Sequence, residues 1–332
     1  MGKLTVWLTK QEPIRVVPIL DKVIVLLLKI IYLFSYMVLR LSIRITLGKK
    51  TRDRVFAKKA FAFNYEFDAI PLFYMFKFLY SIIKFLRLDN HVSLKISVPK
   101  YGYKAYYPIN KNDLINMTIR EDEIIELFTP KEGDIVVDIG AHMGRYTIIG
   151  AKRVGTKGKV VAIEANPSNF EMLNRNIKLN QLTNVISLNN AVYSKETKIK
   201  LYVPDEESGY TIYHTLMERT GKKFVEIDAI TLDYLLLQLN VISGVGVKEE
   251  EAVEVNWIKI DVEGAEFEVL KGASNVLSKS KDIALLMEVH GLNNYRPVVE
   301  FLSSYNFKIE FEKTYETGDK HIILRKYGST IE

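Results

Sequence analysis

Residues 136–147 read VVDIGAHMGRYT and join the end of an apolar strand to the start of a helix. The strand ends at Asp138, and Gly140 and Gly144 bracket the turn that follows. Glycine has no Cβ, so the backbone can take unusual φ values and a ligand can lie directly against the chain. The helix beyond offers free N–H groups and the positive end of its dipole. The stretch therefore predicts a ligand-binding turn at the carboxyl edge of a parallel sheet.

The spacing of this turn separates it from the dinucleotide fingerprint G-x-G-x-x-G. Here the spacing is D-x-G-x-x-x-G, with Ala141 and His142 in the turn, which disfavours a pyrophosphate. It suits a ligand with an amino-acid carboxylate and a cationic centre. Glu164 ends the next apolar strand 26 residues after Asp138, where nucleotide-binding sheets place the acid for the ribose hydroxyls. Two such glycines also fit simple helix packing, but two acids in register favour the ligand.

The region from 131 onward alternates strands with helices. Continuously apolar, β-branched strands are typical of parallel strands buried on both faces. We expect strands at 135–139, 159–164, 185–189, 256–262 and 283–289, and helices near 145–153, 168–179, 231–239, 264–279 and 295–304. Ser168 and Glu171 predict a capping box at the second helix. This alternation predicts a doubly wound α/β sheet, and the segments 307–312 and 320–326 are close enough in sequence to pair antiparallel.

The first 60 residues differ in charge from the rest of the chain. They carry a net charge of +10 in a chain whose total is +6. Residues 23–39 are almost entirely apolar, and Lys22, Lys29, Arg40 and Arg44 share one helical face. This layout fits a helix lying at a membrane interface, a spanning helix, or a helix docked on its own domain. A second segment, 71–87, has the same layout.

These patterns divide the chain into three predicted parts. Residues 1–60 form a basic, hydrophobic helical extension, residues 61–130 a helix and β-hairpin prelude, and residues 131–332 the α/β domain. Basic residues interleaved with aliphatic runs point to anionic lipid through residues 20–59 rather than to nucleic acid. We therefore expect a cytoplasmic protein attached to the inner face of the cell membrane. Polar insertions are expected at 204–223 and 240–254.

Several classes of site are disfavoured by composition. The chain has no cysteine, which excludes disulfides, a thiol nucleophile and cysteine-based metal sites. Its five histidines are scattered, and none lies at ligand spacing from another. The sequence therefore predicts no metal site.

Residues 134–290 resemble the FkbM family of methyltransferases that depend on S-adenosylmethionine (SAM), in particular its versions from thermophilic archaea. The resemblance is carried by VVDIGAHMGRYT (136–147), AIEANPSNFEMLNRNIKLN (162–180), NNAVYS (189–194), TLDYLL (231–236), WIKIDVEGAEFEVLKGA (257–273) and the MEVH that ends the next strand (287–290). It implies a seven-stranded Rossmann-like sheet that ends in an antiparallel hairpin. It also implies that SAM is the cofactor.

The family resemblance assigns the cofactor contacts. Asp138, Gly140 and Gly144 would line the methionine end of SAM, and Glu164 would bind the ribose. Asn190 would flank the adenine, although many SAM enzymes have an acid there. The full expected set is Asp138, Gly140, Ala141, His142, Gly144, Glu164, Ala165, Asn190 and Ala191.

The fourth and fifth predicted strands carry the candidate catalytic residues. Lys259 and Asp261 lie two apart on one strand face, Glu263 begins the next turn, and His290 closes the neighbouring strand. A carboxylate or imidazole within reach of a hydroxyl can take its proton during methyl transfer, so Asp261 and His290 are the candidate bases. Lys259 is equally well explained as a partner that neutralises Asp261, and His290 as a structural hydrogen-bonding residue. Glu266 is expected to be a structural helix residue.

Three functions follow from these features. The favoured one is SAM-dependent O-methylation of a sugar hydroxyl in a glycan or lipid-linked saccharide, where the sugar rests on the resemblance alone. A catalytically inactive SAM-fold adaptor at the membrane is the second. A nicotinamide-dependent reductase is the third, and it lacks the second glycine that such a turn requires.

Overall fold

The structure is a computed structural model, and it describes residues 93–98, 101–108, 122–202, 224–243, 254–315 and 318–328. The chain divides into two compact units, and nearly all described residues belong to the unit made of Lys95–Tyr107 and Ile115–Glu332. The predicted extension 1–60 and both apolar segments lie outside the described residues. Within the described part, no helix combines the length and the apolar character needed to cross a membrane.

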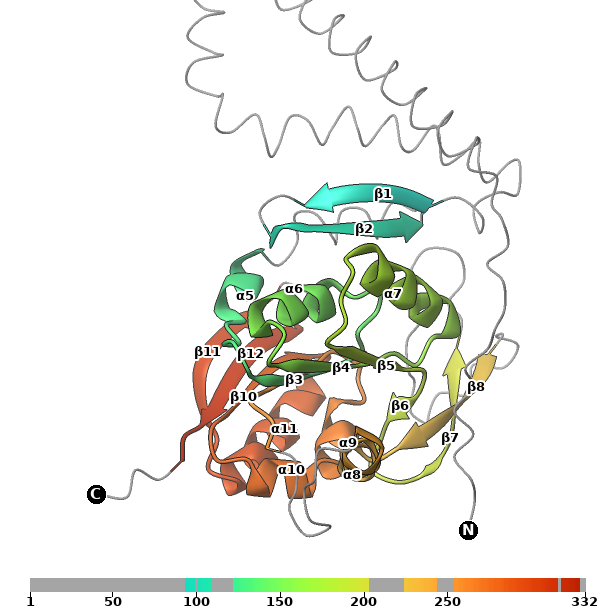
Figure 1. The fold of residues 1–332 in the computed structure, drawn as a ribbon. Helices are drawn as coiled ribbons and strands as arrows, with labels where there is room; N and C mark the ends of the chain where they lie inside the picture. Colours follow the sequence, from blue (N-terminus) through green and yellow to red (C-terminus); the bar gives the residue numbers. More distant parts are fainter. Residues whose placement is uncertain are drawn as a thin grey trace, which may run out of the picture. The chain divides into compact units, whose positions relative to one another are not determined.

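A seven-stranded sheet forms the centre of the domain (Figure 1). Its strand order is β11-β12-β10-β9-β3-β4-β5. The five strands from β10 to β5 are parallel, whereas β12 runs antiparallel to both β10 and β11. The strands are β3 (Ile135–Ile139), β4 (Lys159–Ile163), β5 (Val185–Leu188), β9 (Trp257–Ile260), β10 (Ile283–Val289), β11 (Lys308–Thr314) and β12 (Lys320–Lys326). The predicted Rossmann-like sheet with a C-terminal antiparallel hairpin is therefore confirmed.

Helices cover both faces of the sheet. α5, α6 and α7 lie on one face, and α8 to α11 lie on the other (Figure 1). Their bounds are α5 (Asp122–Leu127), α6 (Arg145–Val154), α7 (Pro167–Leu179), α8 (Leu232–Ser243), α9 (Glu266–Lys271), α10 (Ser274–Lys279) and α11 (Leu292–Ser304). The strand order reverses between β3 and β9, which are neighbours in the sheet although the 117 residues 140–256 separate them in the sequence. In sheets of this kind, ligands bind outside the strand ends at such a reversal.

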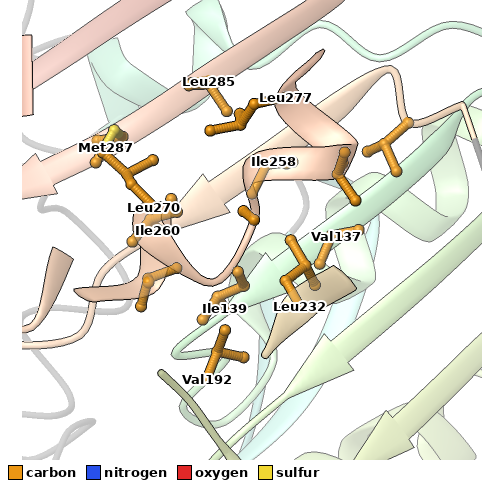
Figure 2. Packing of buried hydrophobic residues seen from close by; sticks show 14 of the residues in the cluster. Val137, Ile139, Val192, Leu232, Ile258, Ile260, Leu270, Leu277, Leu285 and Met287 are labelled. Carbon is orange, nitrogen blue, oxygen red and sulfur yellow. The ribbon is translucent and has the colours of Figure 1, made fainter. Parts of the chain in front are cut away.

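The two cores follow from the alternation of side chains along each strand. Val137 and Ile139 face α8 to α10, together with Ile258 and Ile260 from β9 (Figure 2). Val136 faces the opposite way, into a second core with residues of α5 and α6. Successive side chains of β3 and β9 point to opposite faces, and apolar side chains lie on both, so these strands are buried from both sides. The polar exceptions on these strands are Asp138 and Lys259, which lie next to the strand ends.

Two predicted helix details are wrong. The cap of α7 is Asn166, whose side chain accepts hydrogen bonds from the backbone N–H groups of Ser168 and Asn169, so Ser168 is not the cap. The single helix expected at 264–279 is two helices, α9 and α10, because the helical conformation is interrupted at Gly272. The Asp233 side chain accepts hydrogen bonds from the N–H groups of residues 275 and 276 and so caps the start of α10.

Two smaller sheets complete the described part. A three-stranded sheet has the order β6-β8-β7, from β6 (Ala191–Val192), β7 (Thr197–Tyr202) and β8 (Phe224–Ile230). The sequence analysis placed no strands there; it predicted only the polar insertion 204–223 between them. The predicted hairpin is present as β1 (Ser93–Val98) and β2 (Tyr103–Pro108). Asn176 and Asn180 of α7 hold β2 through hydrogen bonds with its backbone.

Candidate functional site

The glycine turn after β3 is pressed between β4 and β9. The N–H groups of Gly140 and Ala141 both donate to the carbonyl oxygen of Ile163, at 2.9 and 3.0 Å. Gly140 has a φ of +74°, and a Cβ added there would lie 1.8 Å from the Asp261 carbonyl oxygen. Gly144, with a φ of +95°, starts α6 without a side-chain cap. The conformation of the turn therefore requires glycine at both positions.

Glu164 lies beside this turn, at the carboxyl end of β4. Its two carboxylate oxygens accept hydrogen bonds from the N–H groups of His142, at 2.7 Å, and Asn166, at 2.9 Å. His142 has a φ of +52°. The Asn189 side chain donates to the carbonyl oxygens of Glu164 and Ala165, at 2.8 and 3.1 Å, and so fixes the backbone beyond β4. Burial raises the pKa of Glu164 above its usual value.

Asp138 is a buried anchor beneath the turn. Its side chain is 1% exposed, Thr147 donates a 2.5 Å hydrogen bond to Oδ2, and Lys259 lies 3.6 Å from Oδ1. A carboxylate held on both sides in this way positions the start of α6 against β3. The structure thus gives the Asp138 side chain no exposed surface for a cofactor.

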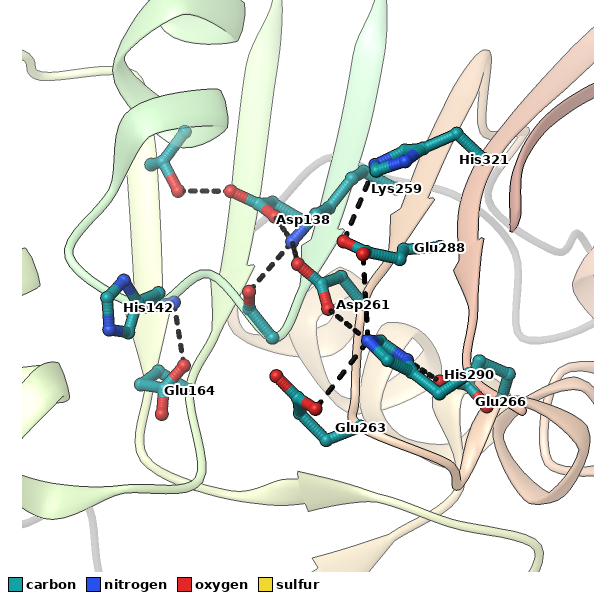
Figure 3. A network of polar contacts seen from close by, with 12 residues as sticks. Asp138, His142, Glu164, Lys259, Asp261, Glu263, Glu266, Glu288, His290 and His321 are labelled. Atoms are coloured by element: carbon teal, nitrogen blue, oxygen red, sulfur yellow. Dashed lines mark hydrogen bonds and ion pairs between the residues drawn. The ribbon is translucent and has the colours of Figure 1, made fainter. Parts of the chain in front are cut away.

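Lys259 connects the glycine turn with the end of β9. Its Nζ donates a 2.8 Å hydrogen bond to the carbonyl oxygen of Gly140, and it lies 3.4 Å from Oδ2 of Asp261. The same ammonium group faces Asp138, so it is shared by two carboxylates (Figure 3). Lys259 therefore neutralises Asp261, as considered from the sequence, and it also positions the glycine turn against β9.

A cluster of one imidazole and four carboxylates follows the ends of β9 and β10; we call it the His290 cluster (Figure 3). Nε2 of His290 lies 3.5 Å from Glu263, 3.8 Å from Glu288 and 4.0 Å from Asp261. On the other side of the ring, Nδ1 lies 2.7 Å from Oε1 of Glu266. The cluster comprises Asp261, Glu263, Glu266, Glu288 and His290.

The His290 cluster perturbs the acidities of its members. Burial alone would lower the pKa of His290, but the hydrogen bond with Glu266 and the charges of Asp261 and Glu263 raise it to about 10. Burial alone would raise the pKa of Asp261, yet the charges of Lys259 and His290 hold it below its usual value. For Glu263, burial and the neighbouring acids raise the pKa. At neutral pH, Asp261 is thus ionised and His290 protonated, which makes Asp261 the better proton acceptor of the two.

His321 lies behind the cluster, on β12. Its Nε2 is 3.4 Å from Oε2 of Glu288, but the side chain is 4% exposed. Burial, together with the positive charges of Lys259 and His290, lowers the pKa of His321 to about 4, although Asp261 opposes the shift. The ring is therefore neutral at physiological pH.

The predicted site residues fall into two neighbouring groups and one more distant pair. The residues 138–144, 164 and 165 meet at the ends of β3 and β4, and Lys259 joins them to Asp261, Glu263 and His290. Asn190 and Ala191 lie beyond β5. Asn190 donates to the Asp228 carbonyl oxygen at 3.3 Å, and Ala191 is buried in β6, so its side chain offers no contact surface.

Sequence reasoning missed three contributors. Glu266 is a helix residue, as expected, at the start of α9, but its contact with His290 was not predicted. His321 and Asn189 were not singled out at all. In the parallel register, Leu286 pairs with Lys259 and Met287 with Ile260. Continued beyond the strands, this register places residues 263 and 290 at the same level. No comparable signal in the sequence marks His321, because β12 pairs antiparallel at a long distance along the chain.

Comparisons with known proteins identify the family of the chain. The family model described as the Methyltransferase FkbM domain matches residues 138–309, which is more than half of the chain. The methyltransferase sdnD of Sordaria araneosa is 27% identical over 189 residues, covering 51% of this chain and 72% of its own length. The hexuronic acid methyltransferase AglP of Haloferax volcanii is 27% identical over 243 residues, covering 69% of this chain and 92% of its own length.

Among solved structures, a SAM-dependent O-methyltransferase from Thermotoga maritima is similar over 72% of this chain and 79% of its own. The identity is 15% and the TM-score 0.38.

Proposed function

Since the chain belongs to the FkbM family of SAM-dependent methyltransferases, we propose that it methylates a hydroxyl group of a sugar, in a glycan or a lipid-linked saccharide. One observation carries the proposal. Lys259 ties the glycine turn, where the cofactor belongs, to Asp261 and so to the His290 cluster. A cofactor seat and a group of proton-accepting side chains therefore share one sheet edge.

The residues of the first group suit SAM. The turn lies between two strand ends and presents the N–H groups at the start of α6, which favour the carboxylate of the methionine moiety. Glu164 stands at the end of β4, where ribose hydroxyls are bound in related sheets, and each of its oxygens has a second lone pair beyond the backbone hydrogen bond it accepts. Asn190 and the backbone of Ala191 would border the adenine. Asp138 would act from beneath, by holding the turn in place.

When bound, SAM supplies a methyl group on a sulfonium sulfur: the acceptor oxygen bonds to the methyl carbon, the carbon–sulfur bond breaks with its electrons on sulfur, and the hydroxyl proton leaves. Asp261 accepts that proton, since it is ionised and stands at the junction of the two groups. Glu263 and His290 orient the hydroxyl beside it. Lys259 keeps Asp261 in position and ionised.

The sugar is suggested by a relative that the alignment covers almost completely. The name of AglP states that it methylates a hexuronic acid, and the alignment spans 92% of AglP. Sugar hydroxyls are weakly acidic, so a site that combines a carboxylate with a neighbouring cationic group fits their deprotonation late in methyl transfer. The polar segments 204–223 and 240–254, most of which lies outside the described residues, would supply acceptor contacts.

The test is methyl transfer from SAM labelled in its methyl group. Full-length protein is incubated with lipid-linked saccharides and free glycans from the cell envelope, and labelled products are analysed by mass spectrometry and NMR. An O-methyl sugar is the expected product. SAM binding without any transfer would instead support the inactive adaptor, and label on protein or nucleic acid would contradict the sugar assignment.

Attachment to a membrane is part of the same proposal. The basic, apolar residues 20–59 would bind anionic head groups, each Lys or Arg contributing on the order of 1 kcal/mol near the surface. Full-length protein should then float with phosphatidylglycerol vesicles at low salt and less with phosphatidylcholine vesicles. Equal recovery with both kinds of vesicle would contradict an anionic surface as the partner.

A further inference from the structure

The geometry points to a divalent cation site of the Mn²⁺ type, formed by Asp261, Glu263 and His290. We infer that the cation holds the acceptor hydroxyl next to the methyl donor. The second part rests on the proposed function, whereas cation binding itself does not. The sequence predicted no metal site, because its five histidines are scattered and none lies at ligand spacing from another; here the ligands come from two neighbouring strand ends.

The spacing of the three ligand atoms fits one cation. One atom from each of Asp261, Glu263 and His290 lies within 4.8 Å of the others. Nε2 of His290 is 3.5 Å from Oε2 of Glu263 and 4.0 Å from Oδ1 of Asp261. Two ligands that each stand about 2.1 Å from one ion are about 3.0 Å apart at a right angle and about 4.2 Å apart on opposite sides. Small side-chain rotations would therefore bring all three into coordination.

The imidazole of His290 is oriented as a ligand. Its Nδ1 faces the Glu266 carboxylate at 2.7 Å, and Glu266 is fully buried and fixed by the N–H of Gly264 at 2.9 Å. Metal-binding histidines commonly donate their second ring N–H to a carboxylate in this way, which fixes the ring and directs the other nitrogen to the ion. Nε2 is directed at the side of the ring where Asp261 and Glu263 lie, and binding of the cation there would displace the proton that His290 carries at neutral pH (Figure 3).

The balance of charge also favours a cation. Asp261, Glu263, Glu266 and Glu288 surround one imidazole. The ammonium of Lys259, on the other side of Asp261, is shared with Asp138. Within the described residues, Oε2 of the buried Glu266 has no hydrogen-bond partner. Carboxylates gathered in this way repel one another, and a divalent ion bound between them would relieve that repulsion.

The ligand types select among metals. Two carboxylates and one imidazole favour Mn²⁺ over Zn²⁺, whose structural sites are rich in Cys and His, and over Mg²⁺, which prefers oxygen alone. The Glu263 side chain is 48% exposed, so coordination positions remain open to solvent or to an acceptor. An ion there would position the acceptor oxygen and lower the pKa of its hydroxyl. The proton would then pass to the carboxylate oxygen of Asp261 that does not bind the cation.

The test measures Mn²⁺ binding directly. Full-length protein is treated with EDTA, dialysed and titrated with Mn²⁺ while free Mn²⁺ is followed by electron paramagnetic resonance. The same titration is made with Glu263→Gln, with His290→Asn and with the control Glu132→Gln, whose carboxylate is exposed and lies before β3. SAM affinity of each protein is measured by calorimetry without metal.

We expect one saturable Mn²⁺ per chain in the wild type and in Glu132→Gln. Binding should weaken at least tenfold in Glu263→Gln and His290→Asn, while SAM affinity stays within about threefold. Absence of saturable binding in the wild type, or equal Mn²⁺ affinity in all four proteins, would overturn the cation site. Mn²⁺ binding is measured without an acceptor and without methyl transfer, so either of these results would leave the proposed methyltransferase activity uncontradicted. Failure of the wild type to bind SAM would count against the proposed function alone.

Discussion

Lys259 donates a 2.8 Å hydrogen bond to the carbonyl oxygen of Gly140, so the cofactor turn and strand β9 are held together at the sheet edge. The same ammonium group is the partner of the buried Asp138 carboxylate. One side chain therefore sets the distance between the turn that we propose binds SAM and Asp261, the proposed proton acceptor. This coupling explains why a lysine stands next to the end of an otherwise apolar strand.

Lys259→Met should destabilise the fold strongly. The substitution leaves Asp138 buried without its cationic partner, and removing one member of a buried ion pair costs about 3–5 kcal/mol. Urea unfolding measures the change. The control Lys198→Met removes an exposed lysine beside Asp228 and should cost less than about 1 kcal/mol. Equal, small losses in the two variants would contradict the bridging position of Lys259.

Gly140→Ala should disrupt the turn itself. The added Cβ would lie 1.8 Å from the Asp261 carbonyl oxygen, so the turn or β9 must move. Gly133→Ala is the matched control, because Gly133 has a φ of +91° but open space around its Cβ position, and it should show only backbone strain of about 1–2 kcal/mol. We expect SAM affinity to be lost in Gly140→Ala and retained in Gly133→Ala, as measured by calorimetry. A similar SAM affinity in both variants would show that the close approach is unimportant.

Glu164→Gln should weaken SAM binding without abolishing the fold. Both carboxylate oxygens accept backbone N–H groups, and a Gln amide nitrogen cannot replace an acceptor. If Glu164 binds a ribose hydroxyl, the substitution removes a charge-assisted hydrogen bond worth about 1.5–3 kcal/mol. SAM affinity should then be roughly 10- to 100-fold weaker. Glu171→Gln, an exposed change on α7, serves as the control for titration calorimetry. The assignment of Glu164 to the cofactor fails if both variants bind SAM as tightly as the wild type.

His321 should make the fold sensitive to mild acid. Its pKa is about 4 in the folded protein, below the value of 6.5 for an unperturbed histidine. The unfolded chain therefore binds more protons between pH 4 and 6.5, so the contribution to stability is complete above pH 6.5 and is lost as the pH falls toward 4. The loss reaches about 3 kcal/mol by this linkage. Unfolding free energies of wild type and His321→Gln across that window measure it, and parallel curves would contradict a buried neutral histidine.

The sequence predicted the architecture well because the parallel strands are continuously apolar runs that alternate with helices. Its misses have a common cause. The break at Gly272 depends on Asp233, about 40 residues away in another helix, and the contact between Glu266 and His290 depends on two neighbouring strand ends. Local patterns carry no signal for such contacts. For Asp138, the sequence predicted a contact with the cofactor, whereas the structure buries its side chain beneath the glycine turn.

The central claim is that Asp261 acts on the acceptor and not on the cofactor. The most direct measurement compares, for wild type and Asp261→Asn, the rate of labelled methyl transfer to the envelope saccharide fraction and the SAM dissociation constant. Asp228→Asn, an exposed change on β8, is the control. The account predicts a transfer rate at least about 100-fold lower in Asp261→Asn, with SAM affinity within about threefold of wild type. Equal losses of rate and SAM affinity, or an unchanged rate, would contradict it.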